Sequence, residues 1–482
     1  MYLCTNSGDI MSMLGDEIDY VHEIFPHIQH PTPFIIELSR ALWELLTYKE
    51  IKTPLSQLTT PILGRFKFLT SYEKEKVIFK IRQRIGSVNR YKISDEELLK
   101  TYFKKFIFSF QESLTYEEIL LVHEIAKNPF SDVRSISKVI NKSSSWISSK
   151  RKELFSKNIL RVILQIDPTY FGLKHKVYVF PVLHEHVDDI EHILSLNPYM
   201  IRMVRFSNYY TPTRDDFLVT SFFVPMSYES KFGKWIRTLL QNEYVSVPLS
   251  LDINSLSHTL NIKMYDGKSW IFDSEKDTLW SYFFTRNFET YISDNETTRV
   301  LKYVGIPKKD FTYADLLIAS ILNLRPFATI KEIAKLLEDK NIYLSKSVIS
   351  EKRKQLAQTM LAHVYLSKCG LNASMSIFIW QPRMSNSEKI FLHKYFTSYF
   401  PQVFTAEGID GFYAVIEFPS SYLVEIREAL VILREYYDDV IMYDMFKTAG
   451  RRAFAEIIDF WDENTGKWVV PKSKFQLSSL KS

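Results

Sequence analysis

The chain has 482 residues, of which 46% are hydrophobic, and its formal net charge is only +5. Such a length and apolar content predict several folded domains. The two cysteines argue against a disulfide framework or a thiolate zinc site and fit a reducing cytoplasm, and no apolar run predicts a signal peptide or a membrane span.

Residues 1–113 are predicted to form a mostly helical region, with helices over 32–49, 71–85 and 94–110. In the first of these, apolar side chains recur at helical spacing and Pro33 falls in the first turn. The region has no counterpart later in the chain. Its role as a cap, a dimerisation element or a partner-binding domain is left open.

The rest of the chain contains one pattern twice. Residues 147–154 (ISSKRKEL) and 349–356 (ISEKRKQL) are identical at six of eight positions, and Pro129-Phe130 and Gly172-Leu173 also recur, as Pro326-Phe327 and Gly370-Leu371. A repeat of about 160 residues is too long for a solenoid and predicts a duplicated two-domain protein. The second copy has a five-residue insertion that we place around Asp339 to Leu344.

Each copy is predicted to contain two domains. Helix, helix, tight turn, helix and strand indicate a winged helix-turn-helix, and the following β-α-β-β-α-β order indicates a ferredoxin-like sandwich. The fold class is therefore α+β, with domains at 114–170 (winged helix 1), 171–282 (ferredoxin-like 1), 311–370 (winged helix 2) and 371–476 (ferredoxin-like 2), and a polar linker at 283–310.

Positive charge is concentrated in the two winged helices. Residues 114–166 and residues 311–368 each contain nine Lys or Arg and five Asp or Glu, whereas the remainder of the chain is net negative. This distribution is typical of segments that face nucleic-acid phosphates.

The third helix of each winged domain is the predicted DNA-reading element. Small polar side chains let a helix backbone approach the major groove, and flanking cations contact phosphates. The predicted DNA-binding residues are Lys142, Ser144, Ser145, Ser148, Ser149, Lys150, Arg151 and Lys152 in the first copy, and Lys346, Ser347, Ser350, Lys352, Arg353 and Lys354 in the second. Ile147, Leu154, Ile349 and Leu356 are expected to be core anchors, and Trp146 to pack under the wing.

These segments resemble the Lrp/AsnC (feast/famine) transcription regulators of bacteria and archaea. Residues 143–154 are similar to that family's recognition helix, and Asp167-Pro168 with Gly172-Leu173 is similar to its passage into the sandwich. The resemblance implies a sequence-specific regulator of double-stranded DNA. Because two units share one chain, the sandwiches are expected to pair as an intrachain pseudo-dimer that presents both recognition helices, and further homo-oligomerisation is left open.

The resemblance also implies a small-molecule effector pocket beside a gly-x-tyr-asp turn. Residues 215–218 and 407–412 are similar to that turn, so the candidate effector residues are Arg214, Asp215, Asp216, Gly408, Asp410 and Gly411. An effector is therefore an open expectation.

Catalytic motifs are missing from the sequence, which contains no GxSxG, P-loop, HExxH or GxGxxG pattern. We therefore expect no enzymatic activity, no cofactor and no metal site. Two alternatives remain: an assembly factor whose winged helices bind protein, and an enzyme similar to the siroheme decarboxylases, which share the winged-helix and sandwich architecture.

Overall fold

The computed structural model describes residues 19–26, 28, 31–48, 66, 70–87, 99, 112–207, 215–241, 245–271, 295–305, 307–308, 311–371, 373–381, 384–437, 439–444, 447–451 and 454–469. The described residues fall into two compact units. One comprises residues up to Glu112 with Ser156–Asn158 and Lys447–Ala449, and the other comprises the remainder.

The N-terminal unit is helical where it is described. Helix α2 (Pro33–Thr47) begins at Thr32, whose hydroxyl accepts a hydrogen bond from the Ile35 amide, and Pro33 fits the first turn because it has no amide hydrogen to donate. Helix α4 (Ser71–Ser87) follows. A core of apolar side chains fills the unit, and Arg82 donates to the carbonyls of Glu23 and Ile24. Most of the helix expected at 94–110 lies outside the described residues.

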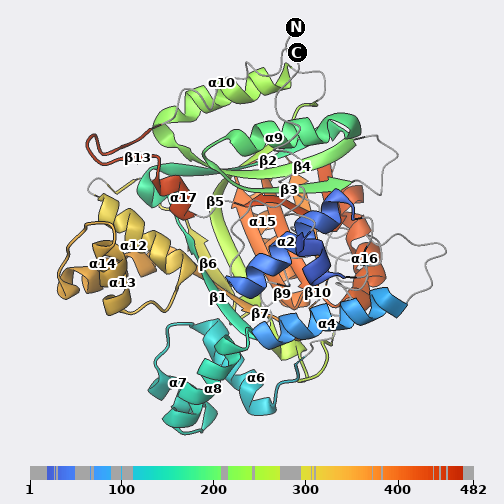
Figure 1. Ribbon diagram of the computed structural model, residues 1–482. Coiled ribbons are helices and arrows are strands. Elements are labelled where there is room, and N and C mark those ends of the chain that lie inside the picture. Colours follow the sequence, from blue (N-terminus) through green and yellow to red (C-terminus); the bar gives the residue numbers. More distant parts are fainter. Residues whose placement is uncertain are drawn as a thin grey trace. The chain divides into compact units, whose positions relative to one another are not determined.

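The second unit contains two three-helix domains, which we call head 1 and head 2 (Figure 1). Head 1 comprises α6 (Tyr116–Lys127), α7 (Val133–Ile140) and α8 (Ser144–Ser156), and leads into strand β1 (Leu160–Ile166). Head 2 comprises α12 (Tyr313–Leu324), α13 (Ile330–Glu338) and α14 (Lys346–Gln358), and leads into β7 (Met360–Leu366). The predicted anchors Ile147, Leu154, Ile349 and Leu356 are all buried, because they repeat on one helix face.

One lysine of each third helix holds its head together. In head 1, Thr115 and Glu118 form a capping box at the start of α6, and Glu118 lies 3.1 Å from the Lys150 ammonium. In head 2, Thr312 and Asp315 form the same box, and Asp315 lies 2.7 Å from Lys352. Burial raises the pKa of Asp315, but hydrogen bonds from Lys352 and Thr312 outweigh burial and leave the pKa below its usual value.

The wing strands of the two heads pair with each other. Strands β1 and β7 form an antiparallel two-stranded ribbon that runs from Leu160 opposite Leu366 to Ile166 opposite Met360. Its central pair is Ile163 and His363. Since each strand belongs to a different copy, the ribbon joins the two repeats at the base of the heads.

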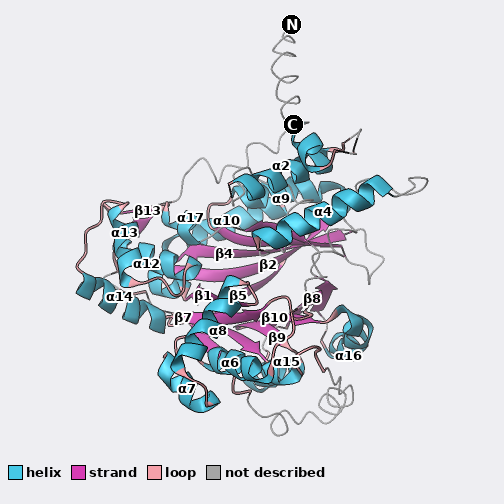
Figure 2. Ribbon diagram, turned by 60° about the horizontal axis from the view of Figure 1, so that its bottom comes forward, coloured by secondary structure: helices cyan, strands magenta, loops and turns pink. Residues whose placement is uncertain are grey.

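Two βαββαβ domains follow the heads, as predicted. Their helices lie on the outside and their strands between them (Figures 1 and 2). The first contains β2 (Leu173–Leu183), α9 (Val187–Leu196), β3 (Met200–Ser207), β4 (Asp215–Pro225), α10 (Glu229–Leu240) and β5 (Leu249–Leu260). The second contains β8 (Ala373–Trp380), α15 (Asn386–Tyr399), β9 (Gln402–Gly408), β10 (Gly411–Phe418), α16 (Leu423–Tyr436) and β11 (Asp439–Asp444).

The two sandwiches share strand β5. Its first residues pair with β2 of its own sandwich, and its later residues, from Ile253 to Leu260, pair antiparallel with β9 of the other. The strand order is therefore β11-β8-β10-β9-β5-β2-β4-β3, and β11 and β3 also approach each other. The sheet thus curls around a common apolar core with side chains from both copies, among them Val177, Val219, Phe378 and Tyr413.

Each copy ends in a segment that reaches the other copy. The indole Nε1 of Trp270 donates to the Cys369 carbonyl at 2.5 Å, and that of Trp468 donates to the Phe171 carbonyl at 2.7 Å. The next residues, Gly172 and Gly370, adopt positive φ angles of 71° and 87°. This conformation explains why glycine occupies both positions.

The structure differs from the predictions in detail. Strand β5 is longer and begins later than the expected 245–253. The second helix of head 1 is capped by Asp132, because the Asp132 carboxylate accepts hydrogen bonds from two backbone amides. Within the expected linker 283–310, Arg299–Lys302 form strand β6, which pairs with β5. The head 2 insertion lies between the end of α13 at Glu338 and the start of α14 at Lys346.

Short elements complete the second unit. They are the 3₁₀ turns η1 (Pro168–Phe171), η2 (His184–His186), η3 (Met226–Tyr228), η4 (Ile262–Met264) and η5 (Ser420–Tyr422), helix α17 (Phe454–Ile458), and the hairpin strands β13 (Trp461–Asp462) and β14 (Lys467–Trp468). Strand β12 spans Lys447–Arg451, of which Lys447–Ala449 belong to the first unit. Among the described helices, none combines the length and the apolarity needed to cross a bilayer.

The lysine contacts inside head 1 can be tested by Lys150→Met, which keeps the aliphatic stem and removes the ion pairs with Glu118 and Glu153. We expect a loss of about 1 kcal/mol in the free energy of unfolding, because Lys150 and Glu118 are largely shielded from water. The control is Lys152→Met, because Lys152 is exposed and lies two residues further along the same helix. It should change the free energy of unfolding by less than about 0.5 kcal/mol. Urea denaturation of both variants checks this, and equal effects would contradict the assignment.

Candidate functional site

The predicted DNA-reading residues divide into exposed and internally bonded sets. Most of the serines and the last lysine of each basic triplet face solvent: Ser144, Ser145, Ser148, Ser149 and Lys152 on α8, and Lys346, Ser347, Ser350 and Lys354 on α14. Both heads therefore present small polar side chains with cations beside them. Trp146 is partly buried and packs against the core of its head.

Four predicted cations are engaged within the protein. Besides Lys150 and Lys352, Lys142 lies 3.1 Å from the Glu117 carboxylate. Arg151 donates to the Pro129 carbonyl at 3.0 Å, and its guanidinium lies 4.8 Å from the centre of the Phe327 ring in head 2. These contacts give the repeated lysine, and the arginine of the first copy, a structural role that the sequence alone did not reveal.

The Arg151 contact belongs to an aromatic junction between the heads. Phe327 of head 2 also packs against Phe130 and Phe155 of head 1, with ring centres 5.9 and 5.2 Å away. Phe130 and Phe327 are equivalent residues of the two copies. The heads therefore meet about their pseudo-two-fold axis through matching loops. Arg353, the head 2 counterpart of Arg151, is partly buried.

The candidate effector residues are not gathered into one place by the described structure. Arg214 lies outside the described residues, and Asp215 and Asp216 begin β4. Gly408 and Gly411 flank the β9–β10 turn that contains Asp410, and the buried Lys389 of α15 donates to the carbonyls of Gly408 and Ile409 at 2.6 and 2.7 Å. A β-carbon at Gly408 would clash with the Leu251 side chain and lie 2.7 Å from the Asp252 carbonyl oxygen, so the glycine is needed for close packing against β5.

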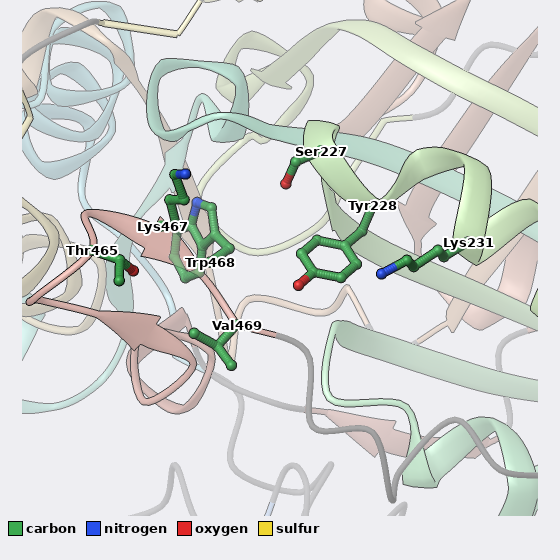
Figure 3. A pocket seen from close by; sticks show the side chains of 7 residues that line it. All are labelled: Ser227, Tyr228, Lys231, Thr465, Lys467, Trp468 and Val469. Carbon is green, nitrogen blue, oxygen red and sulfur yellow. The ribbon is translucent and has the colours of Figure 1, made fainter.

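A hollow that the sequence did not predict lies where the last hairpin of copy 2 meets copy 1. We call it the Trp468 cleft. It has a volume of about 390 Å³ and is lined by Ser227, Tyr228, Lys231, Thr465, Lys467, Trp468 and Val469. Figure 3 shows Tyr228 and Trp468 on opposite sides of the hollow, with Lys231 beside the tyrosine and Lys467 beside the tryptophan.

Hydrogen bonds position the walls of the cleft. Besides the Trp468 bond to Phe171, the Tyr199 hydroxyl donates to the Val469 carbonyl at 2.9 Å. Burial raises the pKa of Tyr199, so the hydroxyl remains protonated and keeps this bond at physiological pH. The hairpin is thus fixed to copy 1 on both sides of the cleft's aromatic wall.

The residues that line the cleft include two lysines and no carboxylate. The nearest carboxylate on α10, Glu229, is turned to Lys174 and Lys176, at 2.6 and 3.0 Å. Lys231 instead lies 4.9 Å from the centre of the Tyr228 ring. Among the described residues, neither Lys231 nor Lys467 forms an ion pair with a carboxylate.

The pseudo-equivalent position of copy 2 differs in charge. There the turn η5 places Tyr422 where copy 1 has Tyr228, and its hydroxyl donates to the Trp270 carbonyl at 3.4 Å. Counting three residues on from each tyrosine, Glu425 stands where copy 1 has Lys231. The Trp468 cleft therefore has a lysine beside its aromatic rings, whereas the related position beside Trp270 has a glutamate.

The repeated hairpin with its tryptophan was the one available signal for the cleft. The sequence shows Gly-Lys followed closely by Trp at the end of both copies, but not that each Trp crosses to the other copy. Among the residues that the structure describes, no group of three or more His, Cys, Asp or Glu side chains could hold a metal ion.

No protein-family model and no curated protein matches the chain. Solved structures are similar at low identity. One is the siroheme decarboxylase NirDL in complex with an iron-uroporphyrin III analogue, with 12% identity and a TM-score of 0.41 over 70% of this chain and 95% of that one. Another is the siroheme decarboxylase NirDL alone, with 10% identity and a TM-score of 0.41 over 71% of this chain and 96% of that one.

These structures correct one expectation. We expected no enzymatic activity, whereas both similar structures are of a decarboxylase, so that expectation is withdrawn. Each of the catalytic motifs that we searched for belongs to a particular fold and chemistry, so their absence excludes only those chemistries. The α+β fold itself, with two winged helices and two ferredoxin-like sandwiches, is confirmed.

Proposed function

We propose that this protein binds an anionic small molecule with a flat aromatic part in the Trp468 cleft. The observation that carries the proposal is the joining of Lys231 and Tyr228 from copy 1 with Lys467 and Trp468 from copy 2 around one hollow. Aromatic walls suit a planar ring, and ammonium groups suit carboxylate or phosphate substituents.

The local charges support an anion rather than a cation. The Glu229 carboxylate is occupied by two lysines of β2, and in the hairpin the Asp462 carboxylate accepts hydrogen bonds from Thr465 and Asn464. The two cleft lysines are left to bind a ligand from opposite sides. Because the pseudo-equivalent position has Glu425, we expect one ligand per chain.

A carboxylate-bearing tetrapyrrole is the ligand class to test first, with decarboxylation as the reaction. One similar structure holds an iron-uroporphyrin III analogue, and such a molecule combines a flat ring with acidic side chains. A volume of about 390 Å³ accommodates one acidic edge of the ring, while the remainder would extend outward between η3 and the hairpin. The chain's own contribution there is charge pairing by Lys231 and Lys467 and stacking by Tyr228.

The test is a titration of the full chain with iron-uroporphyrin III, followed by absorbance. Replacing both lysines by Glu (K231E/K467E) should weaken binding roughly thirtyfold, at about 1 kcal/mol for each lost charge-assisted contact. Mass spectrometry of the tetrapyrrole after incubation reports whether carboxyl groups are removed.

Lys234→Glu is the matched control, because Lys234 is exposed on the same helix but does not line the cleft. It should bind like the wild type. If K234E weakens binding as much as the cleft variant, the attraction is general rather than local. If the wild type does not bind the probe at all, the tetrapyrrole assignment fails.

DNA binding through the heads is a second candidate, supported by the exposed serines and lysines on both third helices. Only Lys152, Lys346 and Lys354 remain as exposed cations of the predicted set, so we infer few phosphate contacts and moderate affinity. The heads meet at the Phe327 junction, which would fix the spacing of two half-sites.

Gel-shift measurements over a range of salt concentrations test this candidate. Substituting Lys152 and Lys354 by Ala should reduce the slope of log affinity against log salt by about 2, because each phosphate contact contributes about 0.9. The K234A variant should keep the wild-type slope. A wild-type protein that retains no DNA at low salt would exclude this candidate and leave the protein-binding alternative for the heads.

A further inference from the structure

Two stacked histidines lie between the ribbon and the shared strand. His258 of β5 and His363 of β7 have ring centres 4.9 Å apart and an interplanar angle of 25°. They are 2% and 4% exposed, and neither the Nε2 atom of His258 nor that of His363 has a hydrogen-bond partner. Both imidazoles are therefore held in apolar surroundings without compensation for a positive charge.

The groups around the two histidines also disfavour a positive charge on either ring. On β7, the Tyr365 hydroxyl lies 3.2 Å from the His363 Nδ1 atom, and on β9 the Phe404 ring centre lies 5.3 Å from that of His363. From β6, the half-buried Arg299 acts on His258 and donates to the Lys127 carbonyl of head 1. No carboxylate is among the described groups that influence either imidazole.

We propose that His258 and His363 form an acid-sensitive latch that holds the β1–β7 ribbon, and with it both heads, against β5 of the sandwich core. A proton on either ring would create a buried cation that faces a second imidazole and, on the His258 side, a guanidinium. Opening the ribbon would return both rings to water, where the cations are solvated.

The direction of the pH dependence follows from the two pKa values. Burial lowers the pKa of His363 to about 3. Burial, His363 and Arg299 together hold the pKa of His258 well below its usual value. The closed ribbon therefore stays unprotonated at neutral pH. As the pH falls below about 6.5, only the open state takes up protons, so opening becomes easier between that pH and the lowered values.

Hydrogen–deuterium exchange of the full chain tests the latch, after correction for the pH dependence of intrinsic exchange. Between about pH 7.5 and about pH 5.5, the opening equilibrium of the ribbon should rise roughly tenfold for each imidazole. Peptides that cover 160–166 and 360–366 report the ribbon. Peptides that cover β10 report the core and should remain protected.

Glutamine variants distinguish the latch from general acid sensitivity. In H258Q/H363Q the opening equilibrium of the ribbon should no longer depend on pH. In each single variant, the logarithm of that equilibrium should change with pH about half as much as in the wild type. The control is H175Q, because His175 is also buried but has partners on both nitrogens, Tyr303 and Ser221. It should leave the dependence of the ribbon intact.

Two results would overturn the proposal. One is a ribbon whose protection falls equally in wild type and in the glutamine variants. The other is simultaneous loss of protection in the ribbon and in β10, which would mean global unfolding. The single variants keep the test usable if the double variant does not fold.

Discussion

The pairing of β5 with β9 is the interaction on which the rest of the second unit depends. It continues one sandwich into the other, so that the two sheets enclose a shared apolar core, beside the core that the second sandwich has between its own sheet and helices. Burial on that scale is the main source of stability in a folded chain. The ribbon, the exchanged tryptophans and the cleft are possible only because this strand pair fixes the two copies side by side.

Covalent duplication lets the two halves of a dimer-like assembly differ. In two identical subunits, a residue such as Lys231 would appear at both related positions, whereas here Glu425 occupies the second. A charged residue can therefore occupy one of two related positions while a different residue occupies the other.

Sequence patterns predicted the elements well but did not separate the cations that bond within a head from those that face solvent. Hydrophobic periodicity placed the helix expected at 32–49 close to its observed bounds, Pro33–Thr47, because that helix buries one regular face. The repeated basic octet was interpreted as a phosphate-binding set, yet Lys150 and Arg151 bond to their own head. A lysine that pairs with the acid of a capping box and a lysine that faces solvent look alike in a sequence. They differ only in whether the folded chain brings a carboxylate close to the ammonium group.

The cleft could not have been predicted for a different reason. Lys231 and Lys467 are far apart in the chain, and they come together only after the last hairpin crosses to the first copy. No local period or spacing encodes such a crossing. The curled sheet has to exist before the two side chains can meet, so the site is a property of the tertiary structure alone.

The exchanged tryptophans also govern the order in which the molecule can be completed during synthesis. The carbonyl of Phe171 receives its indole donor from a residue 297 positions later. During synthesis, the Phe171 carbonyl therefore lacks this donor until almost all of the second copy has been made. Contacts between such distant residues are costly to close and slow to form. The first half can therefore complete its packing only together with the second, which makes the two repeats one folding unit.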